Sequence, residues 1–140
     1  MGTAGSQIEL REGVSLPELK KLVVQTHINL YAEASGDFNP IHLDEEFARK
    51  TPAGGTIAHG MLILAYVSQM MTAAFGRKWV KGGKMEVRFR APARPGDTIT
   101  IGGKICKIEQ SEGKSSVSCD IVCNNQKGEA VITGTAEVRI

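Results

Sequence analysis

The chain is short of cysteine, and this scarcity excludes a disulfide-stabilised scaffold. Its 140 residues contain three cysteines, an odd number with no CxxC pair. Cys119 and Cys123 fall on one expected strand, where they would lie about 13 Å apart at about 3.3 Å per residue. A disulfide requires Cα atoms within roughly 7 Å of each other. We therefore expect Cys106, Cys119 and Cys123 to be buried, reduced thiols of a cytoplasmic protein.

The chain also lacks a long apolar run, a signal-peptide pattern and an excess of one charge. Its most apolar stretch, residues 60–75, contains three polar side chains and is shorter than the roughly 20 apolar residues of a membrane span. Residues 1–10 have neither the basic nor the apolar region of a signal peptide. The 17 basic and 15 acidic residues are spread along the chain. We therefore expect neither a membrane nor a nucleic acid as a partner.

The first half of the chain carries mainly helical patterns. Residues 8–16 are expected to form a first strand, and residues 19–34 have the apolar spacing of a helix. The alternative is a strand over residues 21–24, followed by a helix that Thr26 caps. A short helix is expected over residues 44–50, because acidic residues stand at its N-terminal end.

A long apolar helix is predicted over residues 60–75, with Gly76 as its C-terminal cap. Apolar residues lie on almost every side of this helix, so another element must cover it. The phase of the apolar pattern slips between Ile105 and Ile108, and Gly102-Gly103 suggests a bulge or a sharp bend. The strands that would cover this helix show period-two alternation of apolar and polar residues. They are expected around residues 85–90, 99–108, 117–123 and 130–138.

These patterns predict an α+β domain in which a curved antiparallel sheet wraps around the central helix. The strands follow one another through short turns, which favours antiparallel pairing. Residues 1–140 are expected to form this single domain, with residues 1–7 as a loosely held tail.

The strongest chemical signal lies in residues 31–42, which read Tyr-Ala-Glu-Ala-Ser-Gly-Asp-Phe-Asn-Pro-Ile-His. Asp37 and His42 stand five residues apart, across a turn that Gly36 allows to bend and Pro40 stiffens. Such a carboxylate and imidazole can converge on one small volume and hold a water molecule between them. General acid–base chemistry of this kind is worth roughly 10²–10⁴ in rate. We predict that Asp37 and His42 form a catalytic pair.

A second signal is the sequence Ala58-His59-Gly60-Met61 at the start of the long helix. The first backbone N–H groups of a helix have no partner within it. With the helix dipole behind them, these groups can stabilise a developing oxyanion, and one such donor is worth about 3–4 kcal/mol in a transition state. Base, acid and oxyanion donor are therefore all present in residues 37–60.

The Gly-Asp-x-Asn-Pro-x-His motif at residues 36–42, followed by His-Gly-Met at residues 59–61, resembles the MaoC-like (R)-specific enoyl-CoA hydratases. The resemblance extends over about residues 25–140 and includes the link after the strand at residues 85–90. It implies the hot-dog fold, in which a sheet wraps one helix. It also implies the reversible syn addition of water to a trans-2-enoyl-CoA, which gives a (3R)-3-hydroxyacyl-CoA.

The same resemblance implies roles for individual residues and for partners. By position, Asp37 and His42 are the catalytic pair, and the N–H of Gly60 is the oxyanion donor to the thioester carbonyl. No metal and no redox cofactor is implied. A homodimer is implied, with two sheets joined edge to edge and the acyl tunnel near the interface.

Two further residues are expected to support the site. Asn39 is interpreted as an orienter of the loop, and His59 as a structural residue at the entrance to the long helix. His27, His42 and His59 are too scattered along the sequence, and lack the spacing of ligands, to predict a metal site.

Several functional alternatives remain at this point. The acyl carrier could be coenzyme A or an acyl carrier protein, because both present the same pantetheine arm. Hot-dog domains also hydrolyse thioesters, in which case water attacks the carbonyl carbon instead of the β-carbon. A third hypothesis is a non-catalytic acyl-CoA-binding subunit of a hetero-oligomer. The intact pair of Asp37 and His42 favours the hydratase.

Overall fold

The computed structural model describes residues 8–140, in which five strands and five helices occur. The predicted loose tail at residues 1–7 lies outside the described residues. In chain order the elements are β1 (Leu19–Leu22), α1 (Gln25–Ser35), α2 (Pro40–Leu43), α3 (Glu45–Arg49), α4 (Gly60–Phe75), α5 (Arg77–Gly82), β2 (Lys84–Phe89), β3 (Thr98–Ser111), β4 (Lys114–Asn124) and β5 (Ala130–Arg139).

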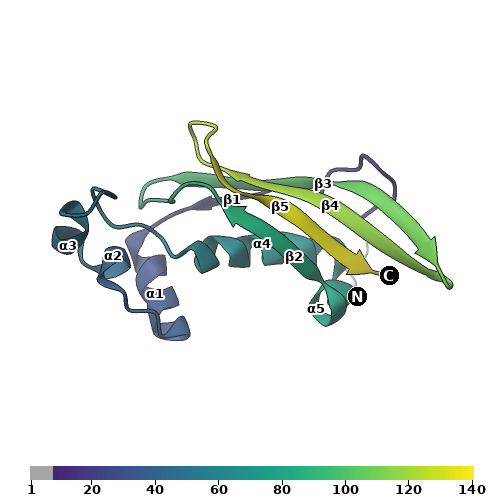
Figure 1. Ribbon diagram of the computed structural model, residues 1–140, viewed down its shortest axis with the longest axis horizontal. Helices are drawn as coiled ribbons and strands as arrows, with labels where there is room; N and C mark the ends of the chain where they lie inside the picture. Colours follow the sequence, from purple (N-terminus) through teal and green to yellow (C-terminus); the bar gives the residue numbers. More distant parts are fainter. Residues whose placement is uncertain (1–7) are drawn as a thin grey trace.

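The strands form one antiparallel sheet in the order β1-β3-β4-β5-β2. The long strands β3 and β4 make the centre, while the short β1 and β2 make the two edges. Figure 1 shows the sheet arching over α4, with α1, α2 and α3 gathered beyond one end of that helix. This is the α+β hot-dog arrangement predicted from the sequence.

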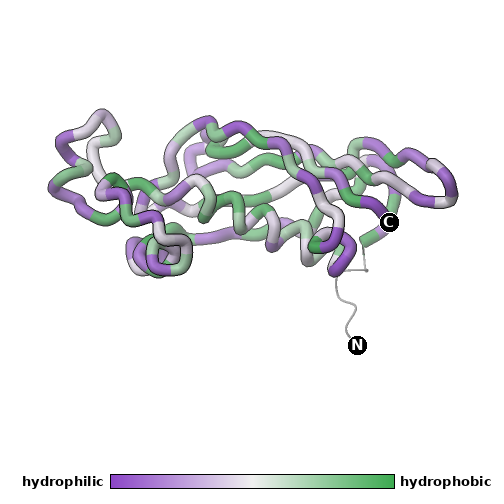
Figure 2. Tube along the Cα trace, turned by 60° about the horizontal axis from the view of Figure 1, so that its bottom comes forward, coloured by the Kyte–Doolittle hydropathy of each residue, from purple (hydrophilic) through white to green (hydrophobic). Residues whose placement is uncertain are grey.

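The core lies between α4 and the concave face of the sheet. Four fully buried side chains of α4, Ile63, Val67, Met70 and Met71, point toward the strands. Every second residue of the strands faces this helix, because successive side chains of a strand point to opposite faces of the sheet. The buried strand residues are Ile99, Ile101, Ile105, Val117, Cys119, Ile121, Cys123, Ile132, Ala136 and Val138. In Figure 2 the tip between β3 and β4 is hydrophilic, as expected of a solvated turn.

The sheet covers α4 as predicted, but in the single chain one face of this apolar helix is left exposed. The side chain of Met61 is 56% exposed, and Ala65, Gln69 and Thr72 are exposed along the same side. These positions recur every three or four residues, so they form one continuous face of the helix. One chain therefore covers only the sheet-facing side of α4.

The first strand predicted over residues 8–16 is also wrong. Only Ser15 makes an isolated bridge there, to Lys104, and the first strand of the sheet is β1. The alternative of a strand followed directly by a helix is nearer, although the residue before α1 is Val24, which makes no side-chain cap. The single helix predicted over residues 19–34 is divided between β1 and α1.

Two details of β3 correct the sequence prediction. The register slips between Ile105 and Lys107, which confirms the predicted slip between Ile105 and Ile108, but the bulge lies at Cys106 and not at Gly102-Gly103. Cys106 is exposed, contrary to the expectation that all three thiols are buried. Cys119 and Cys123 are buried as predicted, and burial raises the pKa of each thiol to about 12. Among the helices of residues 8–140, none is long and apolar enough to cross a membrane.

Replacement of Met70 by Ala tests the packing of α4 against the sheet. Met70 is fully buried, so its truncation should lower the free energy of unfolding by about 2–5 kcal/mol in urea denaturation. The adjacent exposed Gln69 provides the matched control, and Gln69→Ala should change the free energy of unfolding by less than about 0.5 kcal/mol. Equal effects of the two substitutions would contradict this assignment of the core.

Candidate active site

The loop that carries Asp37 is shaped by its own side chains. Gly36 ends α1 in the left-handed conformation, with φ of 80°, which a residue with a Cβ rarely adopts. The Asp37 Oδ1 accepts a hydrogen bond from the N–H of Asn39 at 3.2 Å. The Asn39 Oδ1 in turn accepts from the N–H of Ile41 at 3.0 Å and caps α2. The second carboxylate oxygen of Asp37 is left to face the site.

The ring of His42 is held so that one nitrogen faces Asp37. Its Nδ1 lies 2.8 Å from the carbonyl oxygen of Ile57, which can only accept, so Nδ1 carries the proton of the neutral ring. Its Nε2 lies 4.0 Å from the Asp37 Oδ2. This separation is too long for a direct hydrogen bond, but one water molecule can contact both atoms. The side chain of Asp37 is 53% exposed and that of His42 is 13% exposed.

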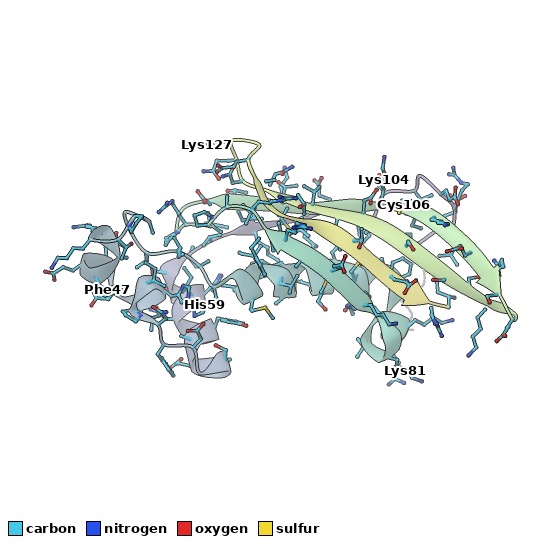
Figure 3. All side chains as sticks on the ribbon, in the orientation of Figure 1. Phe47, His59, Lys81, Lys104, Cys106 and Lys127 are labelled. Carbon is cyan, nitrogen blue, oxygen red and sulfur yellow. The ribbon has the colours of Figure 1, made fainter. Side chains whose placement is uncertain are left out.

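His59 contacts both Asp37 and His42. It is only 2% exposed, and its Nε2 donates to the backbone carbonyl of Asp37 at 3.0 Å. Its ring stacks on that of His42, with centroids 3.9 Å apart and planes inclined by 25°. Tyr31 packs against its other side, with ring centroids 4.8 Å apart. Figure 3 shows His59 at the end of the molecule where α1 and α2 meet α4.

The N-terminus of α4 opens directly beside this pair. His59 precedes the helix without a side-chain cap, and Gly60 is the first helical residue. The N–H of Gly60 has no partner within the helix, because the first four donors of a helix never do. A Cβ on Gly60 would lie 2.8 Å from the Phe89 Cε1, so only glycine lets the ring of Phe89 pack this closely.

An apolar cavity of about 400 Å³ adjoins these groups. His42 and Gly60 line one side of it, while Phe89 and Arg90 of the β2 end line another. The remaining walls are almost entirely aliphatic and include Ile63, Ala93, Val131 and Ile132. The cavity can therefore hold a short hydrocarbon chain whose polar end lies at His42 and Gly60.

Backbone bonds fix the segment that ends at His59. The N–H of Ile57 donates to the carbonyl of Ile41 at 3.2 Å, and the N–H of Ala58 donates to the carbonyl of Ala93 at 2.7 Å. The N–H and the hydroxyl of Thr56 both contact the Glu45 carboxylate and hold the pKa of that carboxyl below its usual range. The segment is therefore anchored to α2, α3 and the turn before β3.

Asp37, His42 and His59 also form the kind of cluster that can hold a metal ion, with ligand atoms within 4.8 Å of one another. The expectation that the histidines are scattered is therefore wrong for His42 and His59, although His27 stays apart on α1. One nitrogen of each ring is already bonded to a backbone carbonyl, Nδ1 of His42 to Ile57 and Nε2 of His59 to Asp37. Each ring therefore has a single nitrogen left that could ligate a metal ion.

The structure brings together each residue predicted for the site. Asp37, His42, Gly60 and His59 converge, while Asn39 lies between Asp37 and His42 in the sequence and shapes the loop. The Ile57 carbonyl, which selects the His42 tautomer, cannot be predicted from the sequence, because every residue has a backbone carbonyl. Tyr31 was present in the motif, but nothing in its spacing indicated contact with His59.

Comparisons with known proteins find relatives over most of the chain. A model of the MaoC like domain family matches residues 5–125. The chain is 31% identical over 126 residues to the 3-hydroxybutyryl-CoA dehydratase of Methylorubrum extorquens, covering 87% of this chain and 76% of the relative. It is 30% identical over 132 residues to an (R)-specific enoyl-CoA hydratase of Rhodospirillum rubrum, covering 94% and 89%.

Solved structures of (R)-hydratases have a similar fold. The (R)-hydratase from Aeromonas caviae that is involved in PHA biosynthesis superposes with a TM-score of 0.79 and 28% sequence identity. The match covers 92% of this chain and 96% of that protein. The likeness to this structure therefore extends over most of the chain.

The hydrogen bonds predict opposite tautomers for the two stacked histidines. In the neutral rings, His42 should carry its proton on Nδ1, which donates to Ile57, and His59 on Nε2, which donates to Asp37. Long-range ¹H–¹⁵N correlation spectra above neutral pH distinguish the two tautomers. The exposed His27 provides an internal reference. The same tautomer at His42 and His59 would contradict the described geometry.

Proposed function

This chain belongs to the MaoC-like domain family, and we propose that Asp37 and His42 are the residues with which it adds water to enoyl thioesters. The protein is a hydro-lyase of the (R)-specific enoyl-CoA hydratase and 3-hydroxyacyl-thioester dehydratase class. The observation that carries the role of the pair is the 4.0 Å separation of the Asp37 Oδ2 and the His42 Nε2 beside an apolar cavity.

In the hydration direction the pair holds one water molecule on one face of the double bond. The pair takes up one proton of this water as its oxygen bonds to the β-carbon. The pair then returns one proton to the α-carbon from the same side, which makes the addition syn. The Nε2 of His42 can accept a proton because its Nδ1–H is committed to Ile57. The dehydration runs through the same steps in reverse.

The N–H of Gly60 is proposed as the donor to the thioester oxygen. Negative charge develops on this oxygen when water adds at the β-carbon, because the electrons of the double bond move toward the carbonyl. The free N–H and the dipole of the 16-residue helix α4 both favour this charge. His42 and Gly60 line the same cavity, so base and oxyanion donor can reach one substrate.

The acyl carrier is proposed to be coenzyme A, with an acyl carrier protein as the alternative. The relatives named above act on 3-hydroxybutyryl-CoA and enoyl-CoA. The aliphatic walls of the cavity favour the acyl part of such a thioester. We also propose a cytoplasmic location, where the buried thiols of Cys119 and Cys123 stay reduced.

The hydration of crotonyl-CoA tests the catalytic pair, and the reaction is measured as the decrease in the absorbance of the enoyl thioester. The wild type should remove the absorbance and give a (3R) product. Asp37→Ala and His42→Ala should each lower kcat by at least about 10², since each removes one member of the acid–base pair. His27→Ala, which removes an exposed histidine of α1, should leave the rate unchanged.

The same assay separates the competing functions. Free thiol that appears while the enoyl absorbance stays constant would indicate a thioesterase. Unchanged absorbance and thiol across chain lengths and carriers would indicate a non-catalytic subunit. Full activity of either Asp37→Ala or His42→Ala would remove that residue from the mechanism.

Gly60→Ala tests the oxyanion donor in this assay. The added methyl group would press on Phe89 and enter the cavity beside the N–H, so kcat/KM should fall by about 10- to 100-fold. Gly82→Ala is the matched control, because a Cβ there meets no atom within 4 Å. Comparable activity of the two variants would argue against the role of Gly60.

A homodimer joined through the edge strand β2 is proposed as the working form. An unpaired strand edge is a ready site for pairing with a second copy, and β2 carries the exposed Phe89 next to the cavity. Light scattering should give a mass near twice the 15.0 kDa of one chain. A mass near 15.0 kDa across micromolar concentrations would contradict the dimer.

A further inference from the structure

We propose that Gln25 is a positioning residue, which holds the backbone of His42 so that its ring stays aligned with Asp37. The inference rests on the proposed function, because it concerns the geometry of the same pair. Gln25 is the first residue of α1, it is half-buried, and it lies 17 positions before His42 in the sequence.

The amide of Gln25 uses both its donor and its acceptor atoms. Its Nε2 donates to the carbonyl oxygen of His42 at 2.8 Å and to the Asn29 Oδ1 at 3.0 Å. A backbone carbonyl can only accept, so the nitrogen of the amide must face His42. The Gln25 Oε1 then faces the hydroxyl of Thr56 at 2.9 Å and accepts from it.

The carbonyl of His42 needs an outside donor. Helix α2 has four residues, and the last carbonyls of a helix have no partner within it. The N–H of Asp44 donates to the carbonyl of Pro40 and so leaves that of His42 free. Gln25 supplies the missing donor at the residue whose ring performs the proposed chemistry.

Thr56 connects this bond to the one that holds the ring. Thr56 is buried, and its neighbour Ile57 accepts the Nδ1–H of His42. A closed circuit therefore runs from Gln25 to the His42 backbone, through the His42 ring to Ile57, and through Thr56 back to Gln25. The single hydroxyl proton of Thr56 is shared between Gln25 and the Glu45 Oε2 at 3.0 Å.

The circuit fixes both ends of His42, which one bond alone cannot do. The Ile57 carbonyl fixes the ring but allows it to pivot about that bond if the backbone moves. Such a pivot changes the separation of 4.0 Å between the His42 Nε2 and the Asp37 Oδ2. A misplacement of about 1 Å at a reacting group can cost about 10² in rate. Loss of Gln25 should therefore act on catalysis more than on folding or binding.

Two substitutions of Gln25 test the proposal in the crotonyl-CoA assay. Gln25→Ala removes the donor, whereas Gln25→Glu keeps the shape but presents a carboxylate oxygen to the His42 carbonyl. Both should lower kcat by about 10- to 100-fold, with KM changed by less than about threefold, because the cavity and Gly60 are untouched. Asn29→Ala is the matched control, since it removes the other acceptor of the Gln25 amide and leaves the His42 bond in place.

A spectroscopic measurement gives a second, independent readout. In the wild type the Nδ1–H of His42 should be a distinct, slowly exchanging proton signal, because it is bonded to Ile57 and its ring is largely buried. In Gln25→Ala this proton should exchange at least about tenfold faster, while the Nε2–H of His59 should be unaffected. A general loss of structure would instead accelerate both.

Thr56→Val provides a further test, because it removes the hydroxyl that donates to Gln25 and keeps the N–H bond to Glu45. If Gln25 and Thr56 act as one unit, the double variant should have about the same kcat as Gln25→Ala alone, and not the product of the two effects. Wild-type kcat and slow His42 exchange in Gln25→Ala would overturn the proposal. A wild type without hydratase activity would overturn the proposed function, and the exchange measurement would still decide whether Gln25 positions His42.

Discussion

The packing of α4 against the concave face of the sheet is the constraint on which the other features depend. Met70 and Val67 are fully buried there, and the central strands β3 and β4 present alternate apolar residues to them. Once this helix is fixed, its N-terminus can lie in only one place, beyond the end of the sheet that α1, α2 and α3 surround (Figure 1). Gly60, the first residue of this helix, thereby comes to line the cavity.

The site around this N-terminus is organised largely by backbone groups. The carbonyls of Asp37, His42 and Ile57 each accept a bond from a side chain, and each of these bonds joins segments that are distant in sequence. Among residues 8–140, the buried side-chain polar atom without a partner is the Nδ1 of His59. A buried polar atom that lacks a partner costs about 1–3 kcal/mol, which the packing around this ring must offset.

How far the sequence predicts this structure depends on the range of the interactions. The helix over residues 60–75 was predicted with its bounds, because its apolar residues and Gly76 are local signals. The strand predicted over residues 8–16 is wrong because the backbone bends at Gly13, where φ is 89°, and only isolated backbone bonds join this segment to β3. The exposed face of α4 was missed for a different reason. Hydropathy reports that a residue prefers burial, but not whether one chain suffices to bury it.

The same distinction applies within the candidate site. Asp37 and His42 were recognisable because they are five residues apart, and the turn chemistry of Gly36 and Asn39 determines their approach. The stacking of His42 on His59 spans 17 residues, and the bond from Thr56 to Gln25 spans 31. Such long-range pairs exist only because the sheet and α4 bring their segments together, and glutamine or threonine alone carries no signal of a partner. The proposed reacting groups can therefore be recognised in a motif, whereas the groups that position them emerge only from the fold.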